Sequence, residues 1–442
     1  MELRRFIFFI GCNPDYRTFI NGVNILPPAT VLAYDFSKNT VSLDQYWTYA
    51  RRGGTDVLED AVDQAYEAID RNVSCMAEYF PGRRFLFGNS GGLDSRLIPH
   101  FARKHDLDFT GFTVLSKRNR LGLKTGTYMA ASRVRNRYGF RQRYVSRMPG
   151  SFQDRLLLDV RNAPITSCNM LDNPVEHLAD LRDAILIYGN PAYLIGHETW
   201  CVSQGFKNVA SWNYFLQYLL RMWNVSQRLT AALSQCVAVD QFFEAAEAYR
   251  PIYEQFKDAG HIQLFQQAHY RSMDFTAHAG GFESLNRTLF SVTLYYPFMD
   301  ECSCRWDDQL LMNRAILKDL NRRVDPRLSK AHDQEFRFLE RPGALRRWRS
   351  RIEARFGLRS SGMESTAVAR SEEFLRFARQ IMCRANPLFA PLGDAQLIFD
   401  RVIASGLFGD SLALNFLKVK KMLDLLFYGE LGDLEREPFK IV

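Results

Sequence analysis

The residues best equipped for chemistry form a short run of glycines and serines with one aspartate. This run is the hexapeptide Ser-Gly-Gly-Leu-Asp-Ser at positions 90–95, and the hydrophobic run Phe85–Phe87 precedes it. Gly91 and Gly92 allow backbone conformations and a close approach that a Cβ atom would forbid. Where such a loop leads into a helix, consecutive amide N–H groups and the helix N-terminus form an anion site. The hexapeptide therefore predicts a phosphate-binding loop.

The side chains of the hexapeptide fit the same ligand. Ser90 and Ser95 offer hydroxyl groups to phosphate oxygens, whereas Asp94 would repel a bare phosphate. A carboxylate is, however, a good ligand for a Mg²⁺ ion that bridges phosphate oxygens. The structural alternative is a Gly-Gly turn in which Asp94 or Ser95 caps the following helix. The functional interpretation predicts ATP and Mg²⁺ as cofactors, with Asp94 as the metal ligand, exposed to solvent at the loop.

Strands and helices alternate around the hexapeptide. Hydrophobic runs predict strands over Phe85–Phe87 and Phe109–Leu115, and helices over Leu93–Lys104 and Tyr128–Tyr138. We also expect a strand at Tyr144-Val145, a helical stretch from Pro174 that includes Ile185, and a strand over Ala192–Ile195. This alternation predicts an α/β fold with a doubly wound, mostly parallel sheet. Ligands of such sheets bind at the carboxyl ends of the strands, where the hexapeptide lies.

The two ends of the chain have a different character. Residues 4–49 predict short strands and turns, including strands over Phe6–Ile10 and Val31–Tyr34 and a turn at 35–39. A helix should follow, because Val57, Ala61, Ala65 and Ile69 recur every four residues. From about residue 207 onward the sequence is helical in character. We expect three parts: an N-terminal β segment (1–50), an ATP-binding domain (51–335) and a helical C-terminal region (336–442).

The hexapeptide matches the SGGxDS signature of the PP-loop ATP pyrophosphatases, and two further segments resemble the asparagine synthetases within that superfamily. Residues 24–35, followed by Tyr46-Trp47, are similar to the link before the synthetase domain. The segment Tyr296-Pro297-Phe298-Met299-Asp300 resembles the family's VPFLD segment. The resemblance, which extends to the β-lactam synthetases, covers about residues 20–335. It implies a PP-loop type of α/β domain and an AMP-forming ligase that adenylates a carboxylate and transfers it to ammonia or an amine.

The resemblance also implies roles for particular residues. The loop residues and a second motif near 195–205 would hold the nucleotide, and the backbone at the C-terminal end of the second strand would contact adenine. A lysine would stabilise charge in the transition state, and His197 would act as a general base beside Glu198. The nucleotide-binding residues are Ser90, Gly91, Gly92, Asp94, Ser95, Val114, Leu115 and Gly196, and the catalytic candidates are Lys330, His197 and Glu198.

Three departures from the family leave alternatives open. Trp200-Cys201 occupies the place of the Asp-Glu pair in the second motif, so Glu198 or waters would have to complete the metal site. His197 could equally be a core or surface histidine, and Lys330 an exposed lysine at a helix start. The family also begins with a catalytic cysteine, whereas residue 2 is Glu2. We therefore expect no glutamine hydrolysis by this chain, so that ammonia, an amine or a separate glutaminase supplies the nitrogen.

Composition limits the possible classes of protein. The 442 residues are 47% hydrophobic and 24% charged, as in soluble globular proteins, and no apolar run reaches the ~18 residues that a membrane span requires. We expect a cytoplasmic protein. Its eight cysteines form no CxxC pair, which predicts reduced and mostly buried thiols. A basic helix over 345–356 could bind a membrane or a polyanion weakly, or could pack its apolar side on its own domain.

Two other functions remain open at this stage. Trp200-Cys201 favours a catalytically degenerate nucleotide-binding relative. The net charge of +8 favours an RNA-modifying PP-loop enzyme, but the sequence shows neither zinc-type cysteine pairs nor an RNA-binding module, so there is no firm sign of nucleic acid. The carboxylate substrate could belong to a small molecule, a glycan or a peptide.

Overall fold

The structure is a computed structural model of the chain. It describes residues 26, 29–47, 53–115, 126–146, 181, 183–188, 212, 247, 250, 253–254, 289–291, 298–307, 310, 314–331, 372–387, 394–404, 417, 420–421 and 424.

The central feature is a sheet in which all five described strands run parallel. Their order is β5-β4-β3-β6-β7, so the chain enters in the middle, at β3, and moves outward through β4 to β5. It then crosses to the other side of β3 for β6 and β7. This is the doubly wound α/β arrangement that the sequence predicts. The strands are β3 (Arg84–Gly88), β4 (Asp108–Leu115), β5 (Arg141–Ser146), β6 (Ile185–Tyr188) and β7 (Leu289–Ser291).

The middle strand is apolar on both of its faces because both are covered. Phe85, Leu86 and Phe87 are all at most 2% exposed. Phe87 packs its ring against Phe109 of β4 and against Phe140, with ring centroids 5.7 and 5.2 Å apart. Leu86 points to the other face, where it joins a cluster with residues of β4, β5 and β6. A strand with this continuous apolar character is typical of the centre of a parallel sheet.

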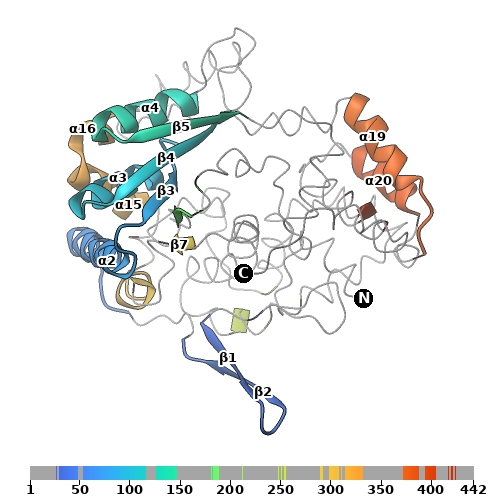
Figure 1. Ribbon diagram of the computed structural model, residues 1–442, viewed down its shortest axis with the longest axis horizontal. Helices are drawn as coiled ribbons and strands as arrows, with labels where there is room; N and C mark the ends of the chain where they lie inside the picture. Colours follow the sequence, from blue (N-terminus) through green and yellow to red (C-terminus); the bar gives the residue numbers. More distant parts are fainter. Residues whose placement is uncertain are drawn as a thin grey trace.

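One layer of helices packs beside β3, β4 and β5 (Figure 1). Helix α3 contacts α4 and β3, and α15 lies against both α2 and α3. The short α16 joins α15 to α4. This layer is what positions the loop that follows β3. Its helices are α2 (Leu58–Tyr79), α3 (Leu93–Lys104), α4 (Gly126–Tyr138), α15 (Ala315–Val324) and α16 (Pro326–Ser329).

Most expected elements are confirmed near the loop, and one is wrong. The helix over 93–104 has the predicted bounds, and the strands around 85–87, 109–115 and 144–145 are present. Ile185, however, lies in strand β6, not in a helical stretch. Ile185, Leu186 and Ile187 are buried and pair with β3, and a short apolar strand of this kind cannot be told from a buried helix by periodicity. The elements expected at Phe6–Ile10, Pro174 and Ala192–Ile195 lie outside the described residues.

A hairpin of β1 (Thr30–Asp35) and β2 (Thr40–Gln45) projects from the molecule, with the predicted turn at its tip (Figure 1). Just after the hairpin, Trp47 is 9% exposed, and its Nε1 donates a hydrogen bond to Asp300 Oδ1 at 3.1 Å. Asp300 belongs to the π-helix η5 (Met299–Ser303). The two segments that resemble asparagine synthetases outside the loop are therefore in direct contact.

The described C-terminal region is helical, as predicted, with α19 (Glu372–Met382) and α20 (Ala395–Ala404) at the side of the molecule away from α3 (Figure 1). Among the described helices, none combines the length and the apolar composition needed to cross a membrane. The described cysteines are thiols that form no disulfide with one another: Cys302 and Cys304 are buried, Cys75 is partly buried and Cys383 is exposed. The basic stretch over 345–356 lies outside the described residues.

Candidate functional site

The hexapeptide at 90–95, from here on the SGGLDS loop, lies where the strand order of the sheet switches direction. It follows β3 after one residue and leads directly into α3. The neighbours of β3 are β4 on one side and β6 on the other, and the chain reaches them by opposite routes. In open α/β sheets, ligands bind outside the carboxyl ends of the strands at this switch point. The strand order and the residue types of the loop thus indicate the same ligand site, at the carboxyl end of β3.

Gly91 is required in the loop by the packing of α4. Its φ is +71°, in the left-handed region that favours glycine. A Cβ atom at this position would lie 2.5 Å from the backbone carbon and Cβ of Ala130 and 2.6 Å from the nitrogen of Ala131. The loop backbone therefore rests directly on α4, and no side chain fits between them.

The SGGLDS loop satisfies some of its own polar groups. The Gly91 amide donates to Asn89 Oδ1 at 3.2 Å and the Gly92 amide to Ser90 Oγ at 3.1 Å. The hydroxyl groups of Ser90 and Ser95 lie 3.2 Å apart. These are long bonds for their types. A phosphate would replace them with charge-assisted bonds, which are shorter and stronger.

The helix that follows the loop begins without a side-chain cap. Gly92 is the N-cap of α3 and has no side chain that could accept a hydrogen bond from the amides of the first turn. The structural alternative, in which Asp94 or Ser95 caps this helix, is therefore wrong. The first turn of α3 keeps its partial positive charge for a ligand.

Asp94 is the ionisable residue of the SGGLDS loop, and burial changes the pKa of its carboxyl group. Its Oδ1 is buried and makes no hydrogen bond within the described part of the chain, although the residue as a whole is partly exposed. Burial raises its pKa to about 6, and the nearby Arg314 opposes that rise. The expectation of an exposed carboxyl group is thus wrong for Oδ1, because the helical layer covers it. A buried carboxylate oxygen without a partner is costly.

This orphaned oxygen fits a Mg²⁺ ligand. Carboxylate oxygen is the donor that Mg²⁺ prefers, and the ion usually takes only one or two carboxylates while waters and phosphates complete its shell. Among the described residues, no group of three or more His, Cys, Asp or Glu side chains could hold a metal. Asp94 would therefore hold the ion together with phosphate oxygens and water.

The segment 314–331 forms a second wall of the site. The sequence predicts Lys330 as a site residue in this segment, but not the contacts that bring the segment to the loop. Asn321 of α15 donates to the carbonyl of Leu93 at 3.1 Å. Arg96, only 2% exposed, donates from Nε to the carbonyl of Gly91 at 3.0 Å and from Nη1 to that of Leu328 at 2.7 Å. In the sequence, the only sign of this contact is that a basic residue, Arg96, lies on the apolar side of α3.

The structure locates several predicted residues relative to the loop. Lys330 is the C-cap of α16, and its side chain is exposed. Val114 and Leu115 end β4, beyond the point where Phe112 pairs with Gly88 at the end of β3, so they lie at the same edge of the sheet as the loop. The remaining candidates, Gly196, His197 and Glu198, lie outside the described residues.

Asp325 fixes the start of the helix that carries Lys330. Its Oδ1 accepts hydrogen bonds from the amides of Arg327 at 2.9 Å and Leu328 at 3.1 Å, and its Oδ2 pairs with Arg137 of α4. Burial opposes ionisation of Asp325, but Arg137 and the two amides outweigh it and hold its pKa below the usual value. The carboxylate is therefore charged at neutral pH and ties α16 to α4.

We expect Asp325→Ala to lower the free energy of unfolding by about 2–4 kcal/mol at pH 7, because it removes a helix cap and leaves Arg137 without its buried partner. A depressed native pKa stabilises the fold above the unfolded pKa of 3.8, and this contribution is lost as pH falls through the native value. Urea unfolding at pH 7 and pH 3.5 measures it. The surface variant Asp319→Asn is the control, and an equal loss in both variants at pH 7 would contradict the role of Asp325.

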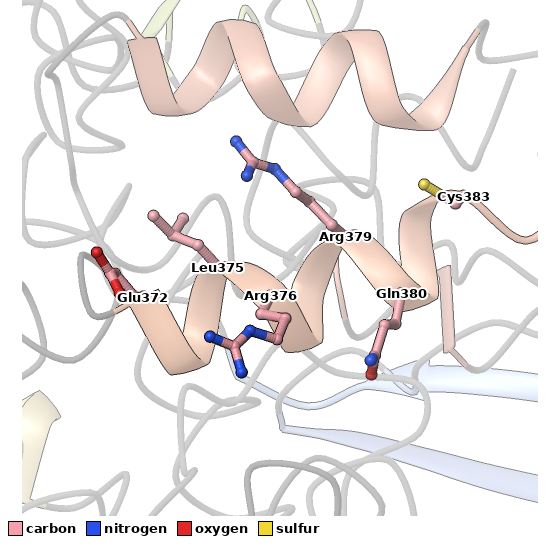
Figure 2. Close-up of a pocket in the computed structure, with 6 residues that line it drawn as sticks. All are labelled: Glu372, Leu375, Arg376, Arg379, Gln380 and Cys383. Carbon is pink, nitrogen blue, oxygen red and sulfur yellow. The ribbon is translucent and has the colours of Figure 1, made fainter.

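Two cavities lined by described residues lie away from the loop. One, of about 610 Å³, is lined by side chains of α19, including Arg376 and Arg379, and by Cys383 just after that helix (Figure 2). The other, of about 470 Å³, includes Asp108 and Arg141, which begin β4 and β5, so it lies at the amino edge of the sheet. The SGGLDS loop is at the carboxyl edge, and its polar chemistry marks it as the candidate site.

No protein-family model matches the sequence, and no curated protein matches it. Solved structures that match include an NH3-dependent NAD synthetase from Campylobacter jejuni subsp. jejuni NCTC 11168 in complex with the nitrate ion, at 11% identity and a TM-score of 0.22, covering 53% of this chain and 94% of that one. The NMN synthetase from Francisella tularensis matches at 13% identity and a TM-score of 0.24, covering 51% and 97%. Because both TM-scores are below 0.5, the fold class rests on the strand order and registers given above.

Proposed function

We propose that this protein is an ATP-dependent, AMP-forming synthetase of the asparagine-synthetase type. It adenylates a carboxylate and transfers the acyl group to ammonia or an amine. The observation that carries the proposal is the buried Oδ1 of Asp94, which has no hydrogen-bond partner in the described chain and lies in the uncapped first turn of α3. A magnesium nucleotide supplies both missing partners: a cation for the carboxylate and phosphates for the helix N-terminus.

Each loop residue has a separate task in this reaction. The backbone of Gly91 and Gly92 lets phosphates approach, and the hydroxyl groups of Ser90 and Ser95 donate to phosphate oxygens. Asp94 would hold Mg²⁺, which when bound neutralises charge on the leaving pyrophosphate. Lys330, carried by the segment that Arg96 binds to the loop, would stabilise negative charge on the reacting phosphate.

The reaction has two steps. A carboxylate oxygen of the substrate attacks the α-phosphorus of ATP, and the bond from that phosphorus to the bridging oxygen breaks, so pyrophosphate leaves with the electron pair. The amine nitrogen then attacks the acyl carbon, AMP leaves, and the nitrogen loses a proton to solvent or to a base. The carboxylate substrate belongs to a small molecule, a glycan or a peptide. The nitrogen comes from ammonia, from an amine substrate or from a separate glutaminase.

The direct test is exchange of labelled pyrophosphate into ATP, with Mg²⁺ and a panel of carboxylic acids. We expect exchange that depends on one class of acid. Ser90→Ala should lower its rate by roughly ten- to a hundredfold, because a hydrogen bond to a charged group is worth about 1.5–3 kcal/mol. The control is Ser37→Ala, in the exposed turn of the hairpin.

Three outcomes would contradict the proposal in different ways. Binding of ATP without exchange for any acid would favour the degenerate nucleotide-binding relative. Exchange that requires added RNA would favour an RNA-modifying enzyme. Exchange that is equally fast in the wild type and in Ser90→Ala would show that the SGGLDS loop takes no part in the reaction.

A further inference from the structure

Arg96 is a buried arginine that joins two distant parts of the chain. Its side chain is 2% exposed. Nε donates to the carbonyl of Gly91, and Nη1 donates to the carbonyls of Leu328 at 2.7 Å and Ala331 at 3.3 Å. One guanidinium group therefore sets the distance between the SGGLDS loop and the end of α16.

These bonds bear directly on Lys330. This lysine lies between Leu328 and Ala331, the two residues whose carbonyls Nη1 contacts. Asp325 holds the start of the same four-residue helix against Arg137 of α4. With both ends of α16 tied to the layer that carries the loop, the backbone of Lys330 has a fixed position relative to the loop.

We propose that Arg96 is a positioning residue that holds Lys330 at the distance from which its ammonium group reaches phosphates bound at the SGGLDS loop. This inference rests on the proposed function. The three hydrogen bonds given above all end on main-chain carbonyl oxygens. Arg96 thus acts through the loop and through Lys330, not through its own contact with the nucleotide.

The geometry requires an arginine. Its planar guanidinium presents donors in fixed, diverging directions, and here two of them reach carbonyls on opposite sides. A lysine would keep the positive charge and most of the volume but has a single ammonium group on a flexible stem. Arg96→Lys therefore tests the diverging donors of the guanidinium group at constant charge, whereas Arg96→Met removes the charge as well.

The experiment is a double-mutant cycle on pyrophosphate release, with ATP, Mg²⁺ and the acid that supports exchange. Displacement of a catalytic group by about 1 Å costs roughly 100-fold in rate, so we expect kcat of Arg96→Lys to fall by about that factor. KM for ATP should change less than about threefold, because the loop amides and serines remain. In a Lys330→Ala background, Arg96→Lys should cost less than about threefold more, since the two changes remove one function.

A second measurement needs only ATP and Mg²⁺. Acetylation of Lys330, followed by mass spectrometry, should be slowed by the magnesium nucleotide in the wild type and not in Arg96→Lys. If Arg96→Met does not fold, as judged by circular dichroism, Arg96→Lys carries both measurements. The control is Arg103→Lys, an exposed position on the same helix, which should behave as the wild type.

The outcomes separate this inference from the proposed function. Additive losses in the cycle, an unchanged kcat in Arg96→Lys, or full activity of Lys330→Ala would each overturn the positioning role and leave the synthetase proposal intact. A wild-type protein that neither releases pyrophosphate nor shows nucleotide protection of Lys330 would overturn the proposed function, and the positioning role with it.

Discussion

Asp94→Asn is expected to abolish ATP–pyrophosphate exchange and, at the same time, to make the protein more stable. The exchange rate should fall by at least about 100-fold, because the amide keeps the shape of the side chain but loses the charge that would hold Mg²⁺ in the proposed site. The gain in stability follows from burial. Oδ1 of Asp94 is buried without a hydrogen bond in the described chain, and ionising the group in that place costs free energy.

The gain in stability of Asp94→Asn is expected to depend on pH. Burial raises the native pKa of Asp94 to about 6 from an ordinary 3.8, so the folded state binds the proton more tightly than the unfolded state. The contribution of Asp94 to stability is then fully present below pH 3.8 and is lost as pH rises to about 6. A shift of about 2 pKa units corresponds to about 3 kcal/mol, which is the upper limit of the gain for Asp94→Asn above pH 6.

Urea unfolding of both proteins between pH 4 and pH 8 measures the effect. We expect similar stabilities near pH 4 and a growing advantage of Asp94→Asn up to about pH 6. Mg²⁺ with ATP should stabilise the wild type at pH 8 and not the variant, since a ligand stabilises only a protein that binds it. Asp56→Asn, an exposed aspartate, is the control. A variant that is less stable than the wild type at pH 8 would show that Asp94 has a structural partner.

The sequence predicts the loop well because its chemistry is local. The hexapeptide contains the glycines, hydroxyl groups and carboxylate in consecutive positions. The run at 85–87 before it is continuously apolar, and the segment 93–104 after it has a helical period. The doubly wound order of the sheet also follows from the alternation of strands and helices. The prediction of a helix at Ile185 is wrong because a four-residue apolar run carries no periodicity that separates strand from helix.

The second wall of the site could not be predicted from the sequence for a different reason. Arg96 and Leu328 are 232 residues apart, and a hydrogen bond from a side chain to a distant carbonyl leaves no mark on the sequence around the carbonyl. The burial of Asp94 has the same origin, because it depends on how the helical layer packs over the start of α3. Local motifs thus reveal which groups can react, whereas long-range packing decides how they are charged and held.

Gly91→Ala is expected to cost far more than an ordinary substitution of a glycine with positive φ. The left-handed conformation alone costs an alanine about 1–2 kcal/mol. At Gly91 the added methyl group would also meet the backbone of Ala130 at 2.5 Å and that of Ala131 at 2.6 Å. Overpacking of this kind costs about 1–3 kcal/mol more, because the loop or α4 has to move.

The chain offers a matched control in Gly82. Its φ of +68° is close to that of Gly91, but a Cβ atom there would meet nothing within 4 Å. We expect urea unfolding to give a loss of about 1–2 kcal/mol for Gly82→Ala and about 2–5 kcal/mol for Gly91→Ala. The difference between the two variants isolates the contact between the SGGLDS loop and α4.

Activity should separate the two glycine variants even more clearly. Gly82→Ala should exchange pyrophosphate as the wild type does, whereas Gly91→Ala should lose most of its exchange under conditions where it is still folded, since its loop no longer rests on α4. Ala130→Gly added to Gly91→Ala removes one of the three close contacts and leaves the two with backbone atoms, so it should restore only part of the stability. Equal losses of stability for Gly82→Ala and Gly91→Ala would mean that α4 does not support the loop. The loop would then lack the rigid packing that we expect phosphate binding to require.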